Sequence, residues 1–466
     1  MNPVTAVRDE PVQWDKALLD KYDIRGPRYT SYPTAAQFVE FGEADYLACL
    51  DELATRPGEP LSLYVHIPFC QDICYYCACN KIVTRNTSLA DSYLGYLDKE
   101  MQLIRAHIGD QRPVTQLHLG GGTPTFLDAG QLTRLVYLLS RHFQLLESDD
   151  REYSIEIDPR TVSHHTLALL KGLGFNRISL GVQDFSDQVQ QAVNRINRFE
   201  DVAALMSAAR DYGYHSINLD LIYGLPMQTP DSLAETLEKV ISLAPERIAF
   251  YNYAHMPERF SSQRAIDRLS LPTAEQKLEM LNLISRRLTE AGYCYIGMDH
   301  FVKPDDALAI AQRQGSLQRN FQGYSTCRAQ DLVSLGVSAI SNGQRYFAQN
   351  AKRLEDYCAA LDAGHLPVEK GLLVSHDDEK HRFAIMQLIS NLKLNIDDWQ
   401  QAFADDFYRY FAAQQPALQQ MADDGLLQLA GHCIEVTPKG RAMLRNICMI
   451  FDEYTGGDTQ RFSKVL

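Results

Sequence analysis

Four cysteines lie close together on one short segment of the chain. They are Cys70, Cys74, Cys77 and Cys79, with the spacing C-x3-C-x2-C-x-C. Three thiolates on a loop this short can each bind one iron of a cubane, which leaves the fourth iron without a required protein ligand. Clusters that only transfer electrons normally close that position with another cysteine. An open iron can bind a further molecule, as the free position of a catalytic zinc does. The spacing therefore predicts a [4Fe–4S] cluster on Cys70, Cys74 and Cys77.

Other interpretations of this segment stay open. A structural zinc site would use Cys79 as its fourth ligand, because no second Cys/His pair at zinc-knuckle spacing occurs. A pure electron-transfer protein would need a fourth cluster ligand. A disulfide is disfavoured in a reducing cytosol. The remaining cysteines are scattered, and we expect them to be small buried side chains: Cys49, Cys294, Cys327, Cys358, Cys433 and Cys448.

The elements that position this segment alternate between short apolar strands and longer helices. We predict strands at residues 61–67, 115–119, 153–157, 177–182, 216–221 and 247–253. Helices are expected between them, for example at residues 90–108, 130–142, 201–212 and 231–243. This spacing is typical of βα units in a parallel sheet. Right-handed crossovers would curl that sheet toward a barrel, and an open doubly wound sheet is the alternative.

Unusual residues follow the predicted strands where each strand ends. The cysteine segment follows the first strand and residues 120–122, a glycine triplet, follow the second. The later strands end at Glu156, Gln183, Asp220 and Ala254. Because ligands bind at the carboxyl ends of parallel strands, these features together predict one site. Glu156 is expected to face it, because an unpaired buried carboxylate is costly; the alternative is an ion pair with a neighbouring arginine.

The chain changes character before and after this region. We expect an N-terminal extension at residues 1–55, the barrel at 56–300, a flanking and connecting region at 301–370, and a C-terminal helical domain at 371–466. In the last of these we predict a helix at 378–392, a hairpin of strands 426–429 and 433–436, and a final helix over 439–451 with Thr437 as its N-cap. This pattern resembles a winged helix, which would either read nucleic acid or serve as a packing domain or lid.

Charge and composition narrow the function classes. The 466 residues carry a formal net charge of −14, which argues against a nucleic-acid partner and against adsorption to anionic membranes, and favours the packing or lid role. No apolar run is long enough to span a membrane. The start of the chain has no hydrophobic signal core, so we expect a cytoplasmic protein. We also expect a monomer.

The cysteine spacing and the glycine triplet together resemble a known superfamily. The pattern C-x3-C-x2-C with Tyr76 before the third cysteine is similar to the signature of the radical S-adenosylmethionine (SAM) enzymes, and residues 120–125 are similar to their GGTP motif. The resemblance implies an α/β fold with a partial (β/α)6 barrel. It also implies that the amino and carboxylate groups of SAM bind the open iron. One electron then cleaves the sulfonium and releases a 5′-deoxyadenosyl radical.

Further segments resemble one branch of this superfamily, the oxygen-independent coproporphyrinogen III oxidases. They are residues 28–34, residues 79–85 with Cys79, residues 224–226 and the C-terminal domain. The resemblance runs from about residue 20 to the end of the chain. It implies decarboxylation of two propionates of coproporphyrinogen III to vinyls, which gives protoporphyrinogen IX in haem synthesis. It further implies two SAM molecules per chain, a one-electron donor such as a flavodoxin or ferredoxin, and an unidentified electron acceptor.

The same resemblance assigns residues to SAM. They are Tyr64, Tyr76, Gly121, Gly122, Thr123, Glu156, Gln183, Arg195, Asp220, Ala254 and Ile340. Arg195 rests on the resemblance alone, since an arginine on a helix is usually a solvated surface group. Cys79 could relay the final electron, contact SAM or merely pack. The alternative function is a haem-trafficking relative, which typically carries Phe in place of Cys79 and lacks the segment 28–34.

The substrate carries four carboxylates although the protein is acidic overall. We hypothesise that local cations beside the cysteine segment receive its propionates, namely Arg28, Lys81 and Arg85. The alternative for each is a solvated surface charge.

Overall fold

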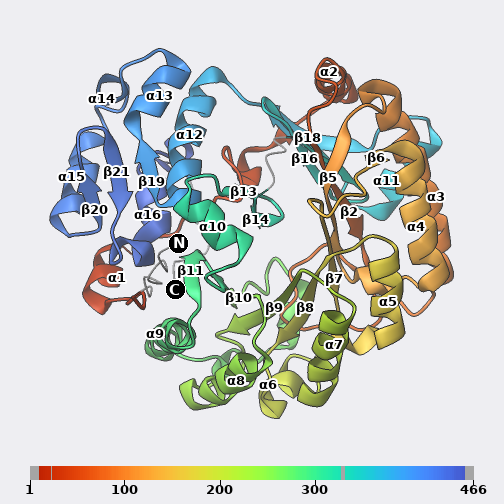
Figure 1. Cartoon of the computed structure of the whole chain (residues 1–466), viewed down its shortest axis with the longest axis horizontal. Coiled ribbons are helices and arrows are strands. Elements are labelled where there is room, and N and C mark those ends of the chain that lie inside the picture. Colours follow the sequence, from red (N-terminus) through yellow and green to blue (C-terminus); the bar gives the residue numbers. More distant parts are fainter. Residues whose placement is uncertain (1–9, 23, 327–330, 457–466) are drawn as a thin grey trace, which may run out of the picture.

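The centre of the molecule is a large twisted sheet with helices around its outside (Figure 1). The computed structural model describes residues 10–22, 24–326 and 331–456. Neighbouring parallel strands of the sheet follow in the order β15, β2, β5, β7, β8, β9 and β10. Their bounds are Asp331–Leu335, Leu61–Ile67, Pro113–Gly121, Glu152–Ile157, Arg177–Gln183, Ser216–Tyr223 and Arg247–Asn252. All of the strands predicted from the sequence are present.

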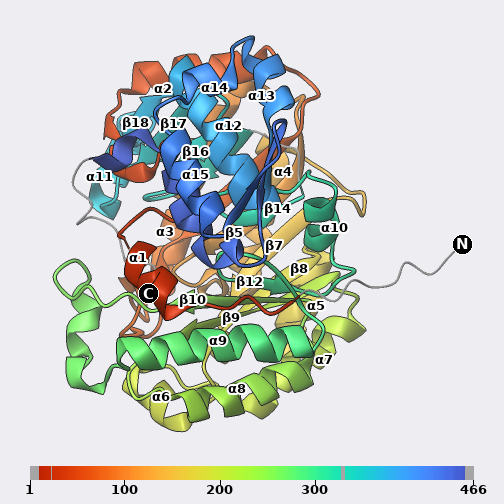
Figure 2. The ribbon, with the colours of Figure 1, turned by 90° about the vertical axis from the view of Figure 1, so that its left-hand side faces the viewer.

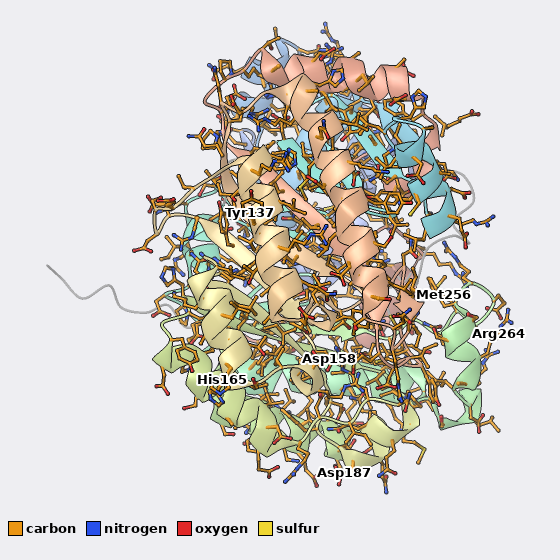
Figure 3. All side chains as sticks on the ribbon, turned by 90° about the vertical axis from the view of Figure 1, so that its right-hand side faces the viewer. Tyr137, Asp158, His165, Asp187, Met256 and Arg264 are labelled. Atoms are coloured by element: carbon orange, nitrogen blue, oxygen red, sulfur yellow. The ribbon has the colours of Figure 1, made fainter. Side chains whose placement is uncertain are left out.

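The helices that connect these strands lie on the outer face of the sheet (Figures 1 and 3). They are α3 (Ser88–Ile108), α4 (Ala129–His142), α5 (His164–Gly172), α6 (Asp187–Ala192), α7 (Phe199–Asp211) and α8 (Pro230–Leu243). Helices on one face, rather than on both, make this an open, partial barrel and exclude the doubly wound alternative. The partial (β/α) barrel expectation is therefore confirmed.

The sequence shows why a helix such as α4 starts and packs as it does. Asp128 accepts a hydrogen bond from the backbone of Gln131, and the Gln131 side chain bonds back to the Asp128 backbone, which forms a capping box. Leu132 and Leu139 bury the inner face of α4 against the sheet, while Tyr137 points outward from it (Figure 3). The amphipathic pattern thus fixes which side of α4 covers the strands.

The sheet continues beyond its parallel part on both sides. Antiparallel strands β16 (Ile340–Asn342), β17 (Tyr346–Asn350), β18 (Val368–Leu373) and β1 (Val39–Glu40) extend it next to β15. On the other side, β12 (His300–Val302) and β11 (Cys294–Gly297) pair antiparallel after β10. Helices α8 and α9 (Ala274–Glu290) lie side by side beneath β9 and β10 (Figure 2).

The C-terminal elements surround a small sheet of their own. Helix α12 (His376–Asn391) precedes β19 (Lys393–Asn395), which pairs with the hairpin β20 (Leu427–Leu429) and β21 (Cys433–Val436). Helices α13 (Ile396–Phe403), α14 (Phe407–Tyr410) and α15 (Gln415–Asp423) complete this part. The predicted helix near 378 and the hairpin are present, and β19 is an additional strand.

The last helix was predicted to be continuous, and this prediction is wrong. A 3-10 turn, Gly440–Met443, is followed by the short helix α16 (Leu444–Met449). Thr437 does cap this segment, because its hydroxyl accepts a hydrogen bond from the Gly440 amide at 2.9 Å. The tight start has a steric cause: a Cβ at Gly440 would lie 2.0 Å from the Leu426 carbonyl oxygen, so the first turn is pressed against the hairpin.

The N-terminal extension is attached to the C-terminal part of the chain. Helix α1 (Lys16–Tyr22) lies beside β20 and α15 (Figure 1), where Lys21 pairs with Asp424 at 2.6 Å. The buried Tyr29 hydroxyl donates to Asp452 at 2.8 Å. The segment 28–34, which the sequence singles out, therefore joins the two ends of the chain.

Two general expectations can be compared with the described residues. No helix among them is both long and apolar enough to cross a bilayer. Of the scattered cysteines, Cys49 and Cys448 are buried as expected. Cys294, Cys358 and Cys433 are only partly buried, which corrects that expectation, and Cys327 falls outside the described residues.

Candidate functional site

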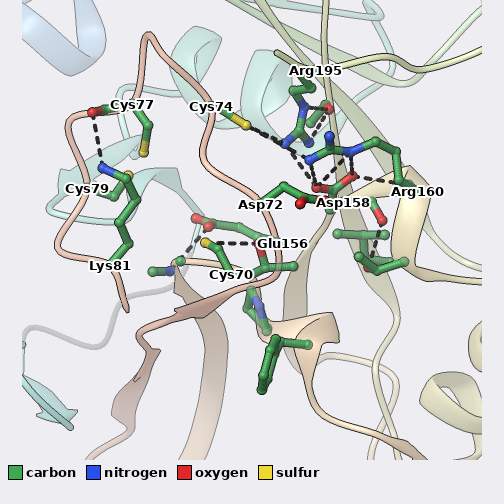
Figure 4. Close-up of a pocket in the computed structure, with 18 of the residues that line it drawn as sticks. Cys70, Asp72, Cys74, Cys77, Cys79, Lys81, Glu156, Asp158, Arg160 and Arg195 are labelled. Atoms are coloured by element: carbon green, nitrogen blue, oxygen red, sulfur yellow. Dashed lines mark hydrogen bonds and ion pairs between the residues drawn. The ribbon is translucent and has the colours of Figure 1, made fainter. Parts of the chain in front are cut away.

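A cavity of about 270 Å³ opens at the carboxyl ends of the parallel strands. Figure 4 shows it with the cysteine loop on one side and charged side chains on the other. Most of the residues predicted from the sequence line it: Cys70, Cys74, Tyr76, Cys77, Cys79, Lys81, Gly121, Gly122, Thr123, Glu156, Gln183, Arg195 and Asp220. The strand-end reasoning thus located one site.

The cysteine loop begins directly after β2. Two short parallel strands, Phe69–Cys70 and Ile82–Val83, pair where the loop leaves the barrel and returns to it. Within it, the Cys77 carbonyl accepts hydrogen bonds from the Ser262 hydroxyl at 2.8 Å and from Lys81 Nζ at 3.3 Å. The Thr123 hydroxyl lies 3.4 Å from the Cys70 sulfur. Backbone and side chains therefore hold the thiols in place from several directions.

The spacing of the sulfurs distinguishes a cubane from a single zinc ion. Four thiolates around one zinc lie about 3.8 Å apart, given Zn–S bonds of about 2.3 Å in a tetrahedron. In the described part of the chain, no three of these sulfurs lie within 4.8 Å of one another. A cubane binds each thiolate to a different iron and so keeps them farther apart. As the loop is arranged here, the thiols are not gathered as the ligands of one zinc ion are.

The loop thiols differ in how readily they lose a proton. The hydrogen bond with Cys79, aided by nearby Lys81, lowers the pKa of Cys77 to about 6. The same contact with Cys77 raises the pKa of Cys79. Burial raises the pKa of Cys70 to about 11. Since the thiolate is the metal-binding form, the lowered pKa of Cys77 favours that form at neutral pH.

Two arginines face the sulfur of Cys74. Arg195 Nη1 lies 3.5 Å from it and Arg160 Nη2 lies 3.9 Å from it. Asp158 joins the two guanidiniums, at 3.0 Å from Arg195 and 2.7 Å from Arg160 (Figure 4). Burial alone would raise the pKa of Asp158, but the two cations outweigh it and hold that pKa below its ordinary value. The group brings a net positive charge close to the Cys74 sulfur.

The glycine triplet allows the second strand to approach the cysteine loop. The Gly122 amide donates to the Ile67 carbonyl at 2.8 Å, and a Cβ at Gly122 would lie 2.7 Å from the Pro68 carbonyl oxygen. Gly121 has φ +116°, and a Cβ there would lie 2.7 Å from the His66 ring. Only glycine fits these positions. Their backbone polar groups are left close to the cavity.

Two further carboxylates, Glu156 and Asp220, line the cavity. Glu156 accepts from the Gly121 amide at 3.3 Å and lies 3.2 Å from His118 Nε2. Its partner is thus a histidine rather than the arginine considered above. Burial raises the pKa of Asp220 to about 6, and both the Ser179 hydroxyl and the Asn218 amide hydrogen-bond to it.

Gln183 ends β8 in a strained conformation. Its φ is +71°, which is uncommon for a residue with a side chain, and the pairing of β8 with β9 shifts register between Gly181 and Gln183. Such strain is frequent at functional sites. The bulge directs the end of this strand into the cavity wall.

Five predicted residues lie outside the residues that line this cavity. Tyr64 stacks on His118 with ring centroids 5.8 Å apart. Ile340 opens β16, and Ala254 follows β10. Arg28 lines a separate cavity of about 40 Å³ and pairs with Asp299 at 2.7 Å.

Arg85 is largely solvated. Its side chain is 83% exposed and pairs with Asp72 at 3.1 Å. Of the three cations hypothesised to bind substrate, Lys81 alone is among the described residues that line the cluster cavity.

The sequence analysis misplaced one site residue and missed two others. Arg195 was expected on a helix, but it lies in the connection between α6 and α7 and is buried, so its solvated-surface interpretation is wrong. Asp158 and Arg160 were not singled out. Both follow β7 directly, at the same strand end as Glu156, and that position was the available indication.

Comparisons with known proteins match nearly the whole chain. The profile of the Radical SAM superfamily matches residues 64–240, and that of the HemN C-terminal domain matches residues 374–443. The chain is 50% identical over 459 residues to an oxygen-independent coproporphyrinogen III oxidase of Pseudomonas aeruginosa, covering 98% of this chain and 100% of the relative. It is 47% identical over 464 residues to that of Escherichia coli, covering 98% and 99%.

A solved structure is similar over nearly the same length. The E. coli coproporphyrinogen III oxidase (HemN), described as a radical SAM enzyme, superposes with a TM-score of 0.90 at 47% identity, covering 96% of this chain and 100% of that one.

Proposed function

The chain belongs to the oxygen-independent coproporphyrinogen III oxidase family of the radical SAM superfamily, and we propose that it catalyses the reaction of that family. It is an oxidoreductase of haem biosynthesis that turns two propionates of coproporphyrinogen III into vinyls, giving protoporphyrinogen IX. The observation that carries this is a loop with three cysteines at the strand ends, facing a cavity lined by the glycine triplet and charged groups.

The resident groups of this superfamily are a [4Fe–4S] cluster and SAM. Cys70, Cys74 and Cys77 are proposed to hold the cluster, supported by their place on one cavity wall and by the sulfur spacing. When bound, the two groups supply a 5′-deoxyadenosyl radical that removes hydrogen from a propionate, after which CO2 and one further electron leave. The proposal includes two SAM molecules per chain, and dialysis of the reconstituted protein against labelled SAM measures that number.

On this proposal, the protein's own residues bind and orient SAM. The backbone at Gly121 and Gly122 and the carboxylate of Glu156 are suited to a zwitterionic amino acid, because they offer carbonyls, amides and one negative charge together. Arg195 and Arg160 partly neutralise the thiolate of Cys74. Tyr76, Thr123, Gln183 and Asp220 complete the polar wall on this proposal. Tyr64, Ala254 and Ile340 keep their SAM assignment only as a proposal from the family resemblance.

Among the cations hypothesised for the substrate, we favour Lys81. Its Nζ is near the loop at the cavity edge, where a propionate can reach it. Arg28 and Arg85 are already engaged with Asp299 and Asp72. Replacing these three cations one at a time should weaken substrate binding only for Lys81.

Other parts of the proposal rest on chemistry more than on contacts. Cys79 is exposed beside Cys77, a position that suits contact with SAM or relay of the final electron. A flavodoxin or ferredoxin is proposed as electron donor, and the acceptor is an unidentified oxidant. We propose that the protein is cytoplasmic, because free thiols and an open cluster persist in a reducing compartment. We also propose that it is a monomer.

Anaerobic reconstitution with iron and sulfide, followed by incubation with coproporphyrinogen III, SAM and reductant, tests the proposal. The expected products are the vinyl tetrapyrrole and 5′-deoxyadenosine. A protein that binds haem and forms no vinyl product would instead be the haem-trafficking relative.

A further inference from the structure

A second cavity, of about 330 Å³, lies inside the barrel. Glu156, Ser179, Gln183 and Asp220 line both this cavity and the one at the cysteine loop, so the two share a wall. Along β7 the second cavity reaches from Glu156 back to Glu152, four residues or about 13 Å of strand. It therefore leads from the cofactor rim toward the opposite end of the strands.

The walls of this inner cavity are polar. The interior of a closed parallel barrel is normally filled by branched apolar side chains. Here the wall includes Gln116, Ser154, Arg177, Ser216, Asn218 and Arg247. Taking so many polar groups out of water is costly unless they find partners. Gln116, Ser154 and Asn218 already hydrogen-bond to neighbouring side chains. Among the described residues, the wall atoms left without a partner include nitrogens of Arg177 and Arg247, which suit a polar ligand.

Arg177 makes only a long ion pair with Glu152, and it has hydrogen-bonding capacity left over. Its Nη2 lies 3.5 Å from Glu152, which is long for a charge-assisted hydrogen bond. The carboxylate of Glu152 is already occupied, because Ser325, Thr326 and Gln116 donate to it at 3.2, 2.5 and 3.4 Å. Among the described residues, Arg177 Nε has no hydrogen-bond partner.

Arg247 offers a second incompletely used guanidinium at the same end of the cavity. Its Nε donates to Asp306 at 2.9 Å, and its Nη2 lacks a partner among the described residues. Burial, and next the positive charge of Arg247, lower the pKa of Arg177. Both guanidiniums line the same cavity, and their like charges repel each other unless an anion lies nearby.

The other titratable groups named at this end add no positive charge to that of the two arginines. His300 lines the cavity from β12, and burial together with Arg319, Arg247 and Arg28 lowers its pKa to about 3. It is therefore neutral at physiological pH and supplies no positive charge of its own. Two carboxylates face the arginines, and both already accept hydrogen bonds. Glu152 accepts from the Thr326 hydroxyl, and Asp306 accepts from Arg247 Nε and from the Leu308 amide.

We propose that the Arg177 and Arg247 end of the inner cavity binds a propionate carboxylate of the tetrapyrrole substrate, one that is not reacting at the cofactor rim. This inference rests on the function proposed above. A tetrapyrrole carries propionates on opposite sides of its ring, so one can be held by the arginines while another faces the cofactor. On the function proposed above, the carboxylate of SAM would bind in the other cavity, which the cysteine loop lines.

The test compares binding of two probes by anaerobic equilibrium dialysis. One is coproporphyrinogen III, and the other is its tetramethyl ester, which has the same ring but no carboxylates. Arg177→Gln and Arg247→Gln should each weaken binding of the acid by about tenfold to a hundredfold, as expected for a lost charge-assisted hydrogen bond, and leave binding of the ester nearly unchanged. Arg177→Lys and Arg247→Lys should recover part of the loss.

Controls separate a binding role from a structural one. Arg353→Gln removes an arginine that is 72% exposed and should change neither affinity. SAM binding should stay at the wild-type level in every variant. Equal losses for acid and ester, or a loss confined to SAM, would overturn the inference. If a glutamine variant does not fold by circular dichroism, the lysine variant decides: its preference for acid over ester must fall below that of the wild type.

Turnover of the wild type, measured alongside, separates this inference from the proposed function. Vinyl product with an unchanged preference for acid in the variants would refute the arginine site alone. No vinyl product from the wild type would refute the function itself.

Discussion

The Nη1 atom of Arg195 lies 3.5 Å from the sulfur of Cys74, which is 121 positions earlier in the chain. Arg160 approaches the same sulfur at 3.9 Å, and Asp158 joins the two arginines. Hydrogen bonds and positive charge at a ligand thiolate stabilise the reduced form of a cluster. If Cys74 is a cluster ligand, as proposed, we expect the arrangement to favour uptake of an electron by the cluster.

Arg160→Gln should lower the reduction potential of the reconstituted cluster. We expect a shift on the order of 60 mV, which is tenfold in a one-electron equilibrium, because one positive charge near Cys74 is lost. Potentiometric titration followed by electron paramagnetic resonance measures the shift. Arg198→Gln is the control, since that side chain is 72% exposed. An unchanged potential at full cluster content would argue against this role.

Replacement of single loop cysteines should distinguish the proposed cluster ligands from Cys79. Cys70→Ala, Cys74→Ala and Cys77→Ala should each lose most of the bound iron and sulfide, because each removes one corner of the cluster. Cys79→Ala should keep a full complement. Iron and sulfide analysis after anaerobic reconstitution gives the result. Loss of the cluster in Cys79→Ala would show that Cys79 is a fourth ligand.

Gly122→Ala should destabilise the protein and displace the cysteine loop. A Cβ there meets the backbone oxygens of Pro68 and Phe69 at 2.7 and 2.9 Å, so we expect a loss of at least about 2 kcal/mol in unfolding free energy and reduced iron content. Gly95→Ala, inside α3, meets nothing within 4 Å and should gain about 1 kcal/mol. Urea unfolding of both variants measures the difference. Equal stability of the two would contradict the close approach.

Glu100 should make stability depend on pH. Burial raises its pKa to about 7, although Tyr357, Asn350 and the Gly336 amide all donate to it. A carboxyl whose pKa is raised on folding favours the folded state fully below its unfolded pKa, and this contribution is lost as pH rises through the folded pKa. Relative to Glu100→Gln, the wild type should therefore lose about 3 kcal/mol between pH 4 and pH 8.

Urea unfolding of wild type and Glu100→Gln across that pH range measures this difference. The altered hydrogen bonds of the glutamine variant shift its unfolding free energy by a constant amount. The quantity to compare is therefore the slope of the unfolding free energy with pH. Parallel pH profiles would show that Glu100 titrates normally.

Much of the fold could be predicted from the sequence because its parts are local. The parallel strands follow from short apolar runs between helical segments, and the location of the site follows from where those strands end. The cysteine spacing alone indicated the cluster. The helix predicted through residue 451 failed because contact of Gly440 with the hairpin, a tertiary effect, decides its first turn.

The rest of the site depends on contacts between distant segments. Nothing in the spacing around Arg195 places it in a loop against Cys74, and β15 joins β2 in the sheet although about 270 residues separate them. Arg28 was expected near the cluster but pairs with Asp299 elsewhere. The polar inner cavity arises from alternate residues of several strands, a pattern that each strand alone does not reveal.

Product analysis under strictly anaerobic conditions tests the central claim most directly. Reconstituted protein with SAM, a strong reductant and coproporphyrinogen III should release CO2 and 5′-deoxyadenosine and yield the divinyl tetrapyrrole, and a Cys74→Ala variant prepared in parallel should yield none. Recovery of unchanged coproporphyrinogen from a preparation that carries its full cluster and cleaves SAM would contradict the account.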